Sequence, residues 1–376
     1  MALQKKKLIY LFIFFLSGLF ILFAFYSKDY SRNEQEDDFV VEKENTFEKT
    51  SLSEMLGQIF VIGFVGKEIT PDVRSLFETI KPGGIIIFSR NIENESQLKN
   101  LISQFQKLSV KLTGLPLFVV VDQEGEPIRR IRWIDDGISQ SEIKNENQAY
   151  WFGFYRGKKL KEMGINVNLA PVLDIAEKGD FIYSRCFQKD PLTNGKLAGE
   201  IINGQKDAGI LTAIKHFPGY GGIKFNPEKV EIPILPSTPE IKQFELAIKS
   251  KPEFVMAGNV IYKSIDKEKI FSLSKKGTNF LRQKIKGDYL IMSDDLSSDV
   301  LEKKFPESQQ VAMAIKAGIN VIIIAGGKES HKRQLNAFYA LKRAVKDKEI
   351  EKQVQNSIYK IIKLKKESLS GGIIGY

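Results

Sequence analysis

Polar side chains with catalytic potential follow three short apolar runs of this sequence. Asp122 ends the first run, Lys215 and His216 end the second, and Asp294 and Asp295 end the third. Carboxylates can serve as nucleophiles or as general acids and bases, and lysine and histidine can donate hydrogen bonds to hydroxyl groups. If the three runs are strands of one parallel sheet, their carboxyl ends bring these side chains together in one site for a polar substrate.

Eight such apolar runs follow residue 50, and segments with helical periodicity, such as Glu95–Leu108 and Asn147–Met163, separate them. This alternation predicts an α/β fold with a parallel sheet covered by helices. The predicted strands are Ile59–Phe64, Gly84–Phe88, Leu117–Asp122, Val167–Pro171, Leu211–His216, Phe254–Ala257, Tyr289–Asp294 and Asn320–Ala325. Eight units favour a TIM-type (β/α)8 barrel, whose active site lies at the carboxyl ends of the strands. An open doubly wound sheet is the alternative, because periodicity does not report closure.

Each polar residue has a simpler explanation when it is taken alone. An aspartate that follows a strand often caps the next helix. Asp174, just beyond the fourth predicted strand, could be such a cap or could belong to the site, and both alternatives stay open. Capping does not explain why Asp122, Lys215 and Asp294 all occur at strand ends. A lysine nucleophile that forms a Schiff base would account for Lys215 but not for the acids.

Six ordered motifs extend the pattern over about residues 52 to 366. They are Lys81–Ile92 (KPGGIIIFSRNI), Val121–Gly125 (VDQEG), Gly164–Asp174 (GINVNLAPVLD), Ser184–Phe187 (SRCF) with Asp190-Pro191, Lys215–Gly219 (KHFPG) and Ile291–Ser297 (IMSDDLS). Together they resemble the family 3 glycoside hydrolases, specifically the single-domain bacterial β-N-acetylhexosaminidases. The resemblance implies a (β/α)8 barrel that hydrolyses β-linked N-acetylhexosamine glycans with retention of configuration.

The resemblance also implies a role for each residue that matches a family motif. Asp294, the first acid of the Ser-Asp-Asp run, becomes the nucleophile that forms a glycosyl-enzyme. The sugar-binding positions fall on Asp122, Arg130, Arg185, Lys215 and His216, and all five are present. Charge-assisted hydrogen bonds from such side chains can hold sugar hydroxyls. We therefore expect an intact carbohydrate pocket that uses neither a metal nor a cofactor.

The loop after the Lys-His pair departs from the family pattern. In the hexosaminidases it reads roughly KHFPGHGxxxxDSH; its final histidine is the general acid/base, and the aspartate two residues earlier orients that histidine. An ungapped alignment with Lys215–Glu228 (KHFPGYGGIKFNPE) places Asn226 at the aspartate and Glu228 at the histidine. Nearby, Glu126-Pro127 replaces the usual Gly-Arg, and Gly258-Asn259 stands where Ala-His is common.

Two hypotheses account for this altered loop. In the first, Glu228 is the acid/base, because a carboxylic acid with a raised pKa is the ordinary proton donor of glycosidases. Asn226 could then orient Glu228, although Lys224 and Lys229 would oppose a raised pKa if they point inward. In the second, the chain is a catalytically impaired member that binds cell-wall glycan as a scaffold. The nucleophile and sugar-binding residues occur together, which favours the first.

The amino-terminal segment predicts a membrane anchor. Residues 8–26 are uncharged and apolar, and as a helix they would be roughly 28 Å long, close to a bilayer core. This run exceeds a secretory h-region and lacks a small-x-small cleavage site, which favours an uncleaved transmembrane helix over a cleaved signal peptide. The lysines at 5–7 predict a cytoplasmic basic tail (1–7), an acid-rich flexible linker (27–50) and an extracytoplasmic or periplasmic barrel (51–376) at a bacterial inner membrane.

Composition limits the remaining possibilities. A formal net charge of +10 suggests an anionic neighbour such as a membrane surface or a cell-wall polymer. Nucleic acid is disfavoured because the chain has no basic motif interleaved with aromatic residues. The single cysteine, Cys186, excludes an intramolecular disulfide, and His216 and His331 lack partners at zinc-ligand spacing. A barrel outside the membrane would meet peptidoglycan, which contains β-linked N-acetylglucosamine, so we expect that glycan or its fragments as substrate.

Overall fold

The computed structural model describes residues 51–134, 138–326 and 330–369, and from Ser53 onward they belong to one compact unit. The predicted cytoplasmic tail, membrane anchor and linker (residues 1–50) lie outside the described residues. Within the described ranges, no helix is both long enough and apolar enough to cross a membrane.

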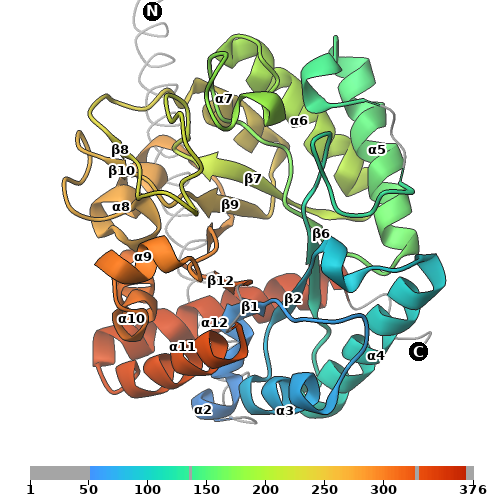
Figure 1. The fold of residues 1–376 in the computed structure, drawn as a ribbon, viewed down its shortest axis with the longest axis vertical. Coiled ribbons are helices and arrows are strands. Elements are labelled where there is room, and N and C mark those ends of the chain that lie inside the picture. The colour runs from blue at the N-terminus through green and yellow to red at the C-terminus, as the bar shows by residue number, and fades with distance from the viewer. Residues whose placement is uncertain (1–50, 135–137, 327–329, 370–376) are drawn as a thin grey trace, which may run out of the picture. The chain divides into compact units, whose positions relative to one another are not determined.

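Eight parallel strands form the central sheet (Figure 1). In chain order they are β1 (Phe60–Ile62), β2 (Gly84–Ile87), β3 (Phe118–Val121), β6 (Val167–Asn168), β7 (Leu211–Phe217), β9 (Phe254–Ala257), β11 (Leu290–Ser293) and β12 (Ile322–Ile324). From β1 to β11 each strand pairs with the next, and β12 pairs with β1. A parallel bridge between Met292 and Val321 spans the seam from β11 to β12. The sheet is thus a nearly closed barrel, which confirms the eight predicted strands and excludes the open sheet.

The helices surround the sheet (Figure 1). They are α2 (Leu52–Met55), α3 (Pro71–Ile80), α4 (Glu95–Thr113), α5 (Glu146–Glu162), α6 (Pro191–Asp207), α7 (Lys242–Ala247), α8 (Lys275–Lys284), α9 (Asp299–Lys304), α10 (Glu307–Ala317), α11 (Ser330–Ala344) and α12 (Lys348–Leu369). Local sequence sets several starts: the side chains of Thr70, Asn94 and Asn145 accept hydrogen bonds from the first turns of α3, α4 and α5. Local capping residues therefore set the starts of these three helices.

Two short strand pairs lie at the carboxyl end of the barrel. β4 (Gln123–Gly125) and β5 (Ile128–Arg129) form a hairpin directly after β3, and β8 (Ile234–Leu235) pairs with β10 (Ile261–Tyr262). The β8–β10 pair ties the long segment after β7 to the segment after β9. These additions build up the end of the barrel at which the candidate catalytic residues lie.

A buried lysine occupies the opposite end of the barrel. Lys365 of α12 is fully buried, and its Nζ donates to Gln58 Oε1 at 2.8 Å in the segment that precedes β1. Burial lowers the pKa of Lys365 to about 7, because the charged ammonium loses its hydration. The lysine also lies over the Phe118 ring, 5.0 Å from its centroid.

We predict that Lys365→Met weakens the dependence of stability on pH. Between about pH 7 and 10 the unfolded chain binds the Lys365 proton and the folded chain does not, so wild-type stability should rise with pH across that window, by up to roughly 4 kcal/mol. Urea unfolding at pH 7 and pH 9.5 measures the change. If the free energy of unfolding depends on pH in the same way in Lys365→Met and in the wild type, the lowered pKa does not belong to Lys365.

Candidate active site

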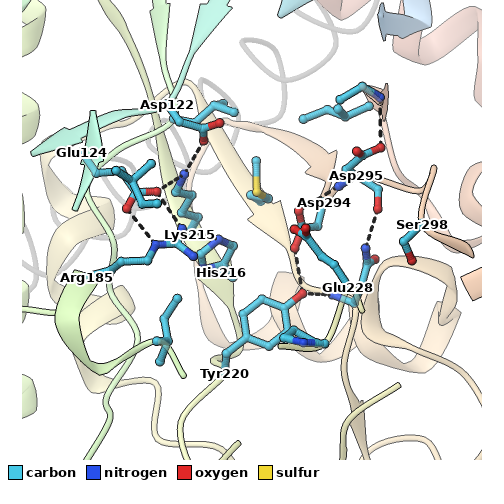
Figure 2. Close-up of a pocket in the computed structure, with 18 of the residues that line it drawn as sticks. Asp122, Glu124, Arg185, Lys215, His216, Tyr220, Glu228, Asp294, Asp295 and Ser298 are labelled. Atoms are coloured by element: carbon cyan, nitrogen blue, oxygen red, sulfur yellow. Dashed lines mark hydrogen bonds and ion pairs between the residues drawn. The ribbon is translucent and has the colours of Figure 1, made fainter. Parts of the chain in front are cut away.

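A cavity of about 310 Å³ opens at the carboxyl end of the barrel. All seven residues predicted for the site line this cavity: Asp122, Arg130, Arg185, Lys215, His216, Glu228 and Asp294. Figure 2 shows these side chains in two groups. Four of them lie on one side of the cavity, Asp122, Arg185, Lys215 and His216, and two lie on the other, Glu228 and Asp294. The structure therefore brings residues more than 170 positions apart in the chain into one concave site.

A network of opposite charges forms the first side. Lys215 Nζ lies 2.7 Å from Asp122 Oδ1 and 2.6 Å from Glu124 Oε1. Arg185 binds Glu124 with two hydrogen bonds of 2.7 and 2.9 Å, and Arg130 Nη2 lies 3.3 Å from Asp122 Oδ2. Since two carboxylates hold Lys215 as their cation, the geometry argues against a Schiff-base lysine, which must react as a neutral amine. The network presents fixed donors and acceptors to a polyhydroxylated ligand.

The cations of this network hold its acids in the charged form. Burial alone would raise the pKa of the Glu124 carboxyl, but Arg185 and Lys215 lower it to about 2. The same balance of burial against Lys215 and Arg130 lowers the pKa of Asp122. Burial would lower the pKa of Arg185, but the Glu124 carboxylate raises it above its usual value. Asp122 and Glu124 therefore stay ionised, and Arg185 stays protonated, at physiological pH.

We predict that Glu124→Gln destabilises the fold by about 3 kcal/mol at pH 7, because it removes the anion that pairs with two buried cations. The native pKa of about 2 lies below the ordinary 4.5, so the contribution of Glu124 is complete above pH 4.5 and disappears as pH falls toward 2. The difference in free energy of unfolding between the wild type and Glu124→Gln should be smaller at pH 3 than at pH 7. The exposed Glu126→Gln, which loses only a surface pair with Arg129, should cost less than about 1 kcal/mol; an equally small effect of Glu124→Gln would contradict the prediction.

Asp174 orients the site histidine. His216 Nδ1 lies 2.8 Å from Asp174 Oδ2, and the same carboxylate accepts the backbone N–H groups of His216 and Tyr220 at 3.2 and 2.6 Å. A proton on Nδ1 leaves Nε2 as the acceptor for Arg185, 3.4 Å away. The two readings left open for Asp174 are thus resolved: it supports the site, and the next helix, α6, is capped by Asp190.

The predicted nucleophile, Asp294, is held at both oxygens. The Tyr220 hydroxyl donates to Oδ2 at 2.7 Å, and the backbone N–H of Asp295 donates to Oδ1 at 2.8 Å. Asp295 itself accepts hydrogen bonds from Ser297 and from the backbone of Ala325 across the seam of the barrel. The first acid of the Asp-Asp pair therefore faces the cavity, and the second anchors the turn that carries it.

Glu228 reaches the cavity beside Asp294 (Figure 2). Although the residue lies at the exposed rim, burial of its carboxyl raises the pKa, and the carboxylates of Asp294 and Asp295 add to the increase while Arg185 opposes it. Lys224 forms a 2.6 Å salt bridge with Asp180 instead of lining the cavity, so the expected objection to a protonated Glu228 does not hold for this lysine. Lys229 is exposed and does not line the cavity either.

Asn226 supports Glu228 through the main chain. Its Oδ1 accepts the backbone N–H of Glu228 at 2.9 Å, as in the turns that asparagine side chains commonly form. The expectation that Asn226 orients Glu228 is therefore met at the backbone, and the contact that the structure shows does not involve the carboxyl group.

The loop that carries Glu228 is anchored before and after this turn. Ile223 and Tyr220 pack in a hydrophobic cluster with Cys186, Val260 and Tyr262. Asp180 accepts the backbone N–H of Gly222 at 2.9 Å, and β8 fixes the chain beyond the loop. The acid at position 228 thus lies in a hydrogen-bonded turn between two fixed points.

A family model gives the chain its classification. The model described as the glycosyl hydrolase family 3 N-terminal domain matches residues 51–364, which include every strand of the barrel and every residue of the site. The chain belongs to glycoside hydrolase family 3. The family comprises glycosidases, so the resemblance expected from the six motifs is confirmed.

Known family 3 proteins share the barrel. The beta-hexosaminidase of Idiomarina loihiensis is 29% identical over 291 residues, which cover 74% of this chain and 86% of that protein. The solved family 3 β-N-acetylglucosaminidase from Paenibacillus sp. FPU-7 superposes with a TM-score of 0.78 at 26% identity and covers 85% of this chain, which spans 63% of that longer protein. A β-N-acetylhexosaminidase from Beutenbergia cavernae, 22% identical, has the same fold, with a TM-score of 0.78 over 84% of this chain and 99% of that one.

Three residues of this family 3 site were not predicted from the sequence. Glu124, Tyr220 and Asn259 all line the cavity. Glu124 lies within the VDQEG motif, and Asn259 lies in the Gly258-Asn259 departure from the family pattern. Tyr220 lies in the altered loop, but its contacts are not evident from the motif. Within the described ranges, no group of three or more His, Cys, Asp or Glu side chains is arranged to hold a metal ion.

Proposed function

We propose that the chain is a retaining β-N-acetylhexosaminidase in which Asp294 is the nucleophile and Glu228 is the general acid/base. The observation that carries the proposal is the pairing of these acids in one cavity: Asp294 is held as an acceptor by two hydrogen bonds, and the pKa of Glu228 is raised. An attacking carboxylate beside a carboxyl group that can donate a proton is what retaining glycoside hydrolysis requires.

The first step forms a glycosyl-enzyme. A carboxylate oxygen of Asp294 attacks the anomeric carbon, the glycosidic bond breaks, and the Glu228 proton passes to the leaving oxygen. In the second step Glu228 takes a proton from water as that water attacks the anomeric carbon, and Asp294 leaves as a carboxylate. Two displacements at one carbon give net retention of configuration.

Loss of charge on Asp294 explains how Glu228 changes role. The Asp294 carboxylate is one of the groups that raise the pKa of Glu228. When Asp294 becomes an ester in the glycosyl-enzyme, that repulsion disappears, and the pKa of Glu228 falls. The same residue is then an acid before the intermediate forms and a base after it.

Support for the substrate comes from the relatives and from the shape of the site. The relatives are named for action on hexosamine or N-acetylglucosamine, and the network around Lys215 offers the fixed donors and acceptors that sugar hydroxyls need. We extend the proposal to β-linked N-acetylglucosamine in peptidoglycan or its fragments, met by a barrel held outside the bacterial inner membrane through residues 8–26. A reporter fused after Thr50 tests that orientation: activity inside the cytoplasm would contradict it.

Nitrophenyl glycosides test the activity. Residues 50–376 should release nitrophenol from the β-N-acetylglucosaminide much faster than from the β-glucoside, and the sugar product should first appear as the β-anomer. If the protein releases nitrophenol from neither substrate yet binds peptidoglycan fragments, the enzyme proposal fails, and the scaffold alternative replaces it.

A further inference from the structure

The phenol of Tyr220 joins the nucleophile to a neighbouring strand end. Its hydroxyl donates to Asp294 Oδ2 at 2.7 Å and accepts the backbone N–H of Asn259 at 2.5 Å. Tyr220 is buried, and burial together with the Asp294 charge raises its pKa well above the ordinary value. The hydroxyl therefore keeps its proton and stays a donor to Asp294 throughout the physiological pH range.

Asn259 ties the same unit to the turn that carries the nucleophile. Its Nδ2 donates to the carbonyl oxygen of Asp295 at 2.8 Å, and its Oδ1 accepts the Ser272 hydroxyl at 2.6 Å. The Asn259 side chain is thus fixed at both polar atoms. Its backbone N–H, which follows β9, points at the Tyr220 hydroxyl from a rigid position.

The residue before Asn259 leaves room for the tyrosine. A Cβ atom at Gly258 would lie 3.3 Å from Tyr220 Cζ and 3.4 Å from its hydroxyl oxygen. Contacts this short between a Cβ and a packed ring force one partner to move by a few tenths of an ångström. The Asp294 carboxylate bonds to this same hydroxyl group, so a movement of the ring would act directly on the 2.7 Å hydrogen bond.

Both segments that meet at the Tyr220 hydroxyl depart from the family pattern. Tyr220 stands where the family loop has the histidine of its Pro-Gly-His-Gly segment, and Gly258-Asn259 stands where Ala-His is common. The two departures lie 38 positions apart in the sequence and meet at one hydroxyl group. An interlocked contact explains why they occur in the same chain.

We infer that Tyr220, Gly258 and Asn259 form one positioning unit for the nucleophile: the phenol fixes Asp294, Asn259 fixes the phenol, and the glycine admits the ring. The inference rests on the proposed function for its kinetic consequences. Tyr220 also shares Asp174 with His216, so the unit connects the sugar-binding side of the cavity to the nucleophile.

A double-mutant cycle on nitrophenyl β-N-acetylglucosaminide tests the unit. Tyr220→Phe and Gly258→Ala should each lower kcat by about 10- to 100-fold while KM changes less than about twofold, because a carboxylate displaced by a fraction of an ångström attacks poorly but does not bind the sugar. The double variant should fall no further than Tyr220→Phe alone, since Tyr220→Phe already removes the hydrogen bond that Gly258→Ala distorts. Effects that multiply, or a Tyr220→Phe enzyme with wild-type kcat, would overturn the inference.

Tyr289→Phe is the matched control, because the Tyr289 hydroxyl is also buried and donates to a carbonyl, that of Ile285 at 2.7 Å, but Tyr289 does not line the cavity. It should keep kcat within about twofold of wild type. A crystal structure of Gly258→Ala gives a readout without turnover: the distance from the Tyr220 hydroxyl to Asp294 Oδ2 should exceed the 2.7 Å of the wild type by a few tenths of an ångström. An unchanged distance there overturns the inference even if the wild type proves inactive, and inactivity of the wild type counts against the proposed function alone.

Discussion

Asp294→Asn is expected to lower the rate of nitrophenol release by at least about 10⁴-fold, because the neutral amide cannot form the glycosyl-enzyme. The amide matches the carboxylate in size and keeps an oxygen that can accept the Tyr220 hydroxyl, so the fold should survive. Steady-state kinetics measures the loss. Calorimetric binding of N-acetylglucosamine should stay within about tenfold of wild type, since the network around Lys215 is untouched.

Asp207→Asn is the matched control for this substitution. Asp207 is an exposed carboxylate at the end of α6 that accepts the Tyr150 hydroxyl far from the cavity, and its loss should leave kcat unchanged. Asp294→Asn activity within tenfold of wild type would show that another group attacks the sugar.

Glu228→Gln should separate substrates by their leaving groups. Glycosides with a poor leaving group, such as a second sugar, need a proton from residue 228 and should slow by about 10² to 10⁴. A dinitrophenyl glycoside needs no proton to leave, so its first step should proceed. The glycosyl-enzyme should then accumulate, because no base activates water. Mass spectrometry of the intact protein would detect the added sugar on Asp294.

The pH profile gives a second readout of the same residue. Because the pKa of Glu228 is raised, its acid form persists to higher pH than an ordinary glutamate, and its ionisation should set the alkaline limb of kcat/KM. That limb should disappear in Glu228→Gln. Glu231→Gln, an exposed neighbour on the same loop that does not line the cavity, should keep both the limb and the rate. A limb that survives in Glu228→Gln would assign it to another group.

The sequence predicted the barrel because strand formation here depends on local apolar runs. Each of the eight runs became a strand within a few residues of its predicted ends, and the acids after them converged because parallel strands share a carboxyl edge. The chief difference lies in β6, which stops at Asn168 where the prediction ran to Pro171. Pro171 has no N–H to donate to the sheet, and pairing with β7 resumes after it, at the bridge between Val172 and Lys215.

The contacts that tune the site could not be predicted in the same way. The raised pKa of Glu228 arises from burial and from the carboxylates of Asp294 and Asp295. A local sequence pattern cannot predict that residues 66 positions apart lie close together. The direction of the Lys224 side chain depends on Asp180, and the role of Tyr220 depends on the space left at Gly258. Motif comparison located Glu228 and Gly258-Asn259 as departures from the family pattern, and only the packed structure shows what these residues contact.

Azide added to Glu228→Ala tests the central claim most directly. Alanine opens space beside the glycosyl-enzyme, and the azide anion needs no general base to attack the anomeric carbon. If Glu228 is the acid/base and Asp294 the nucleophile, azide should accelerate turnover of the dinitrophenyl glycoside and yield the β-glycosyl azide. Turnover that does not respond to azide, or a product of the α configuration, would contradict these assignments.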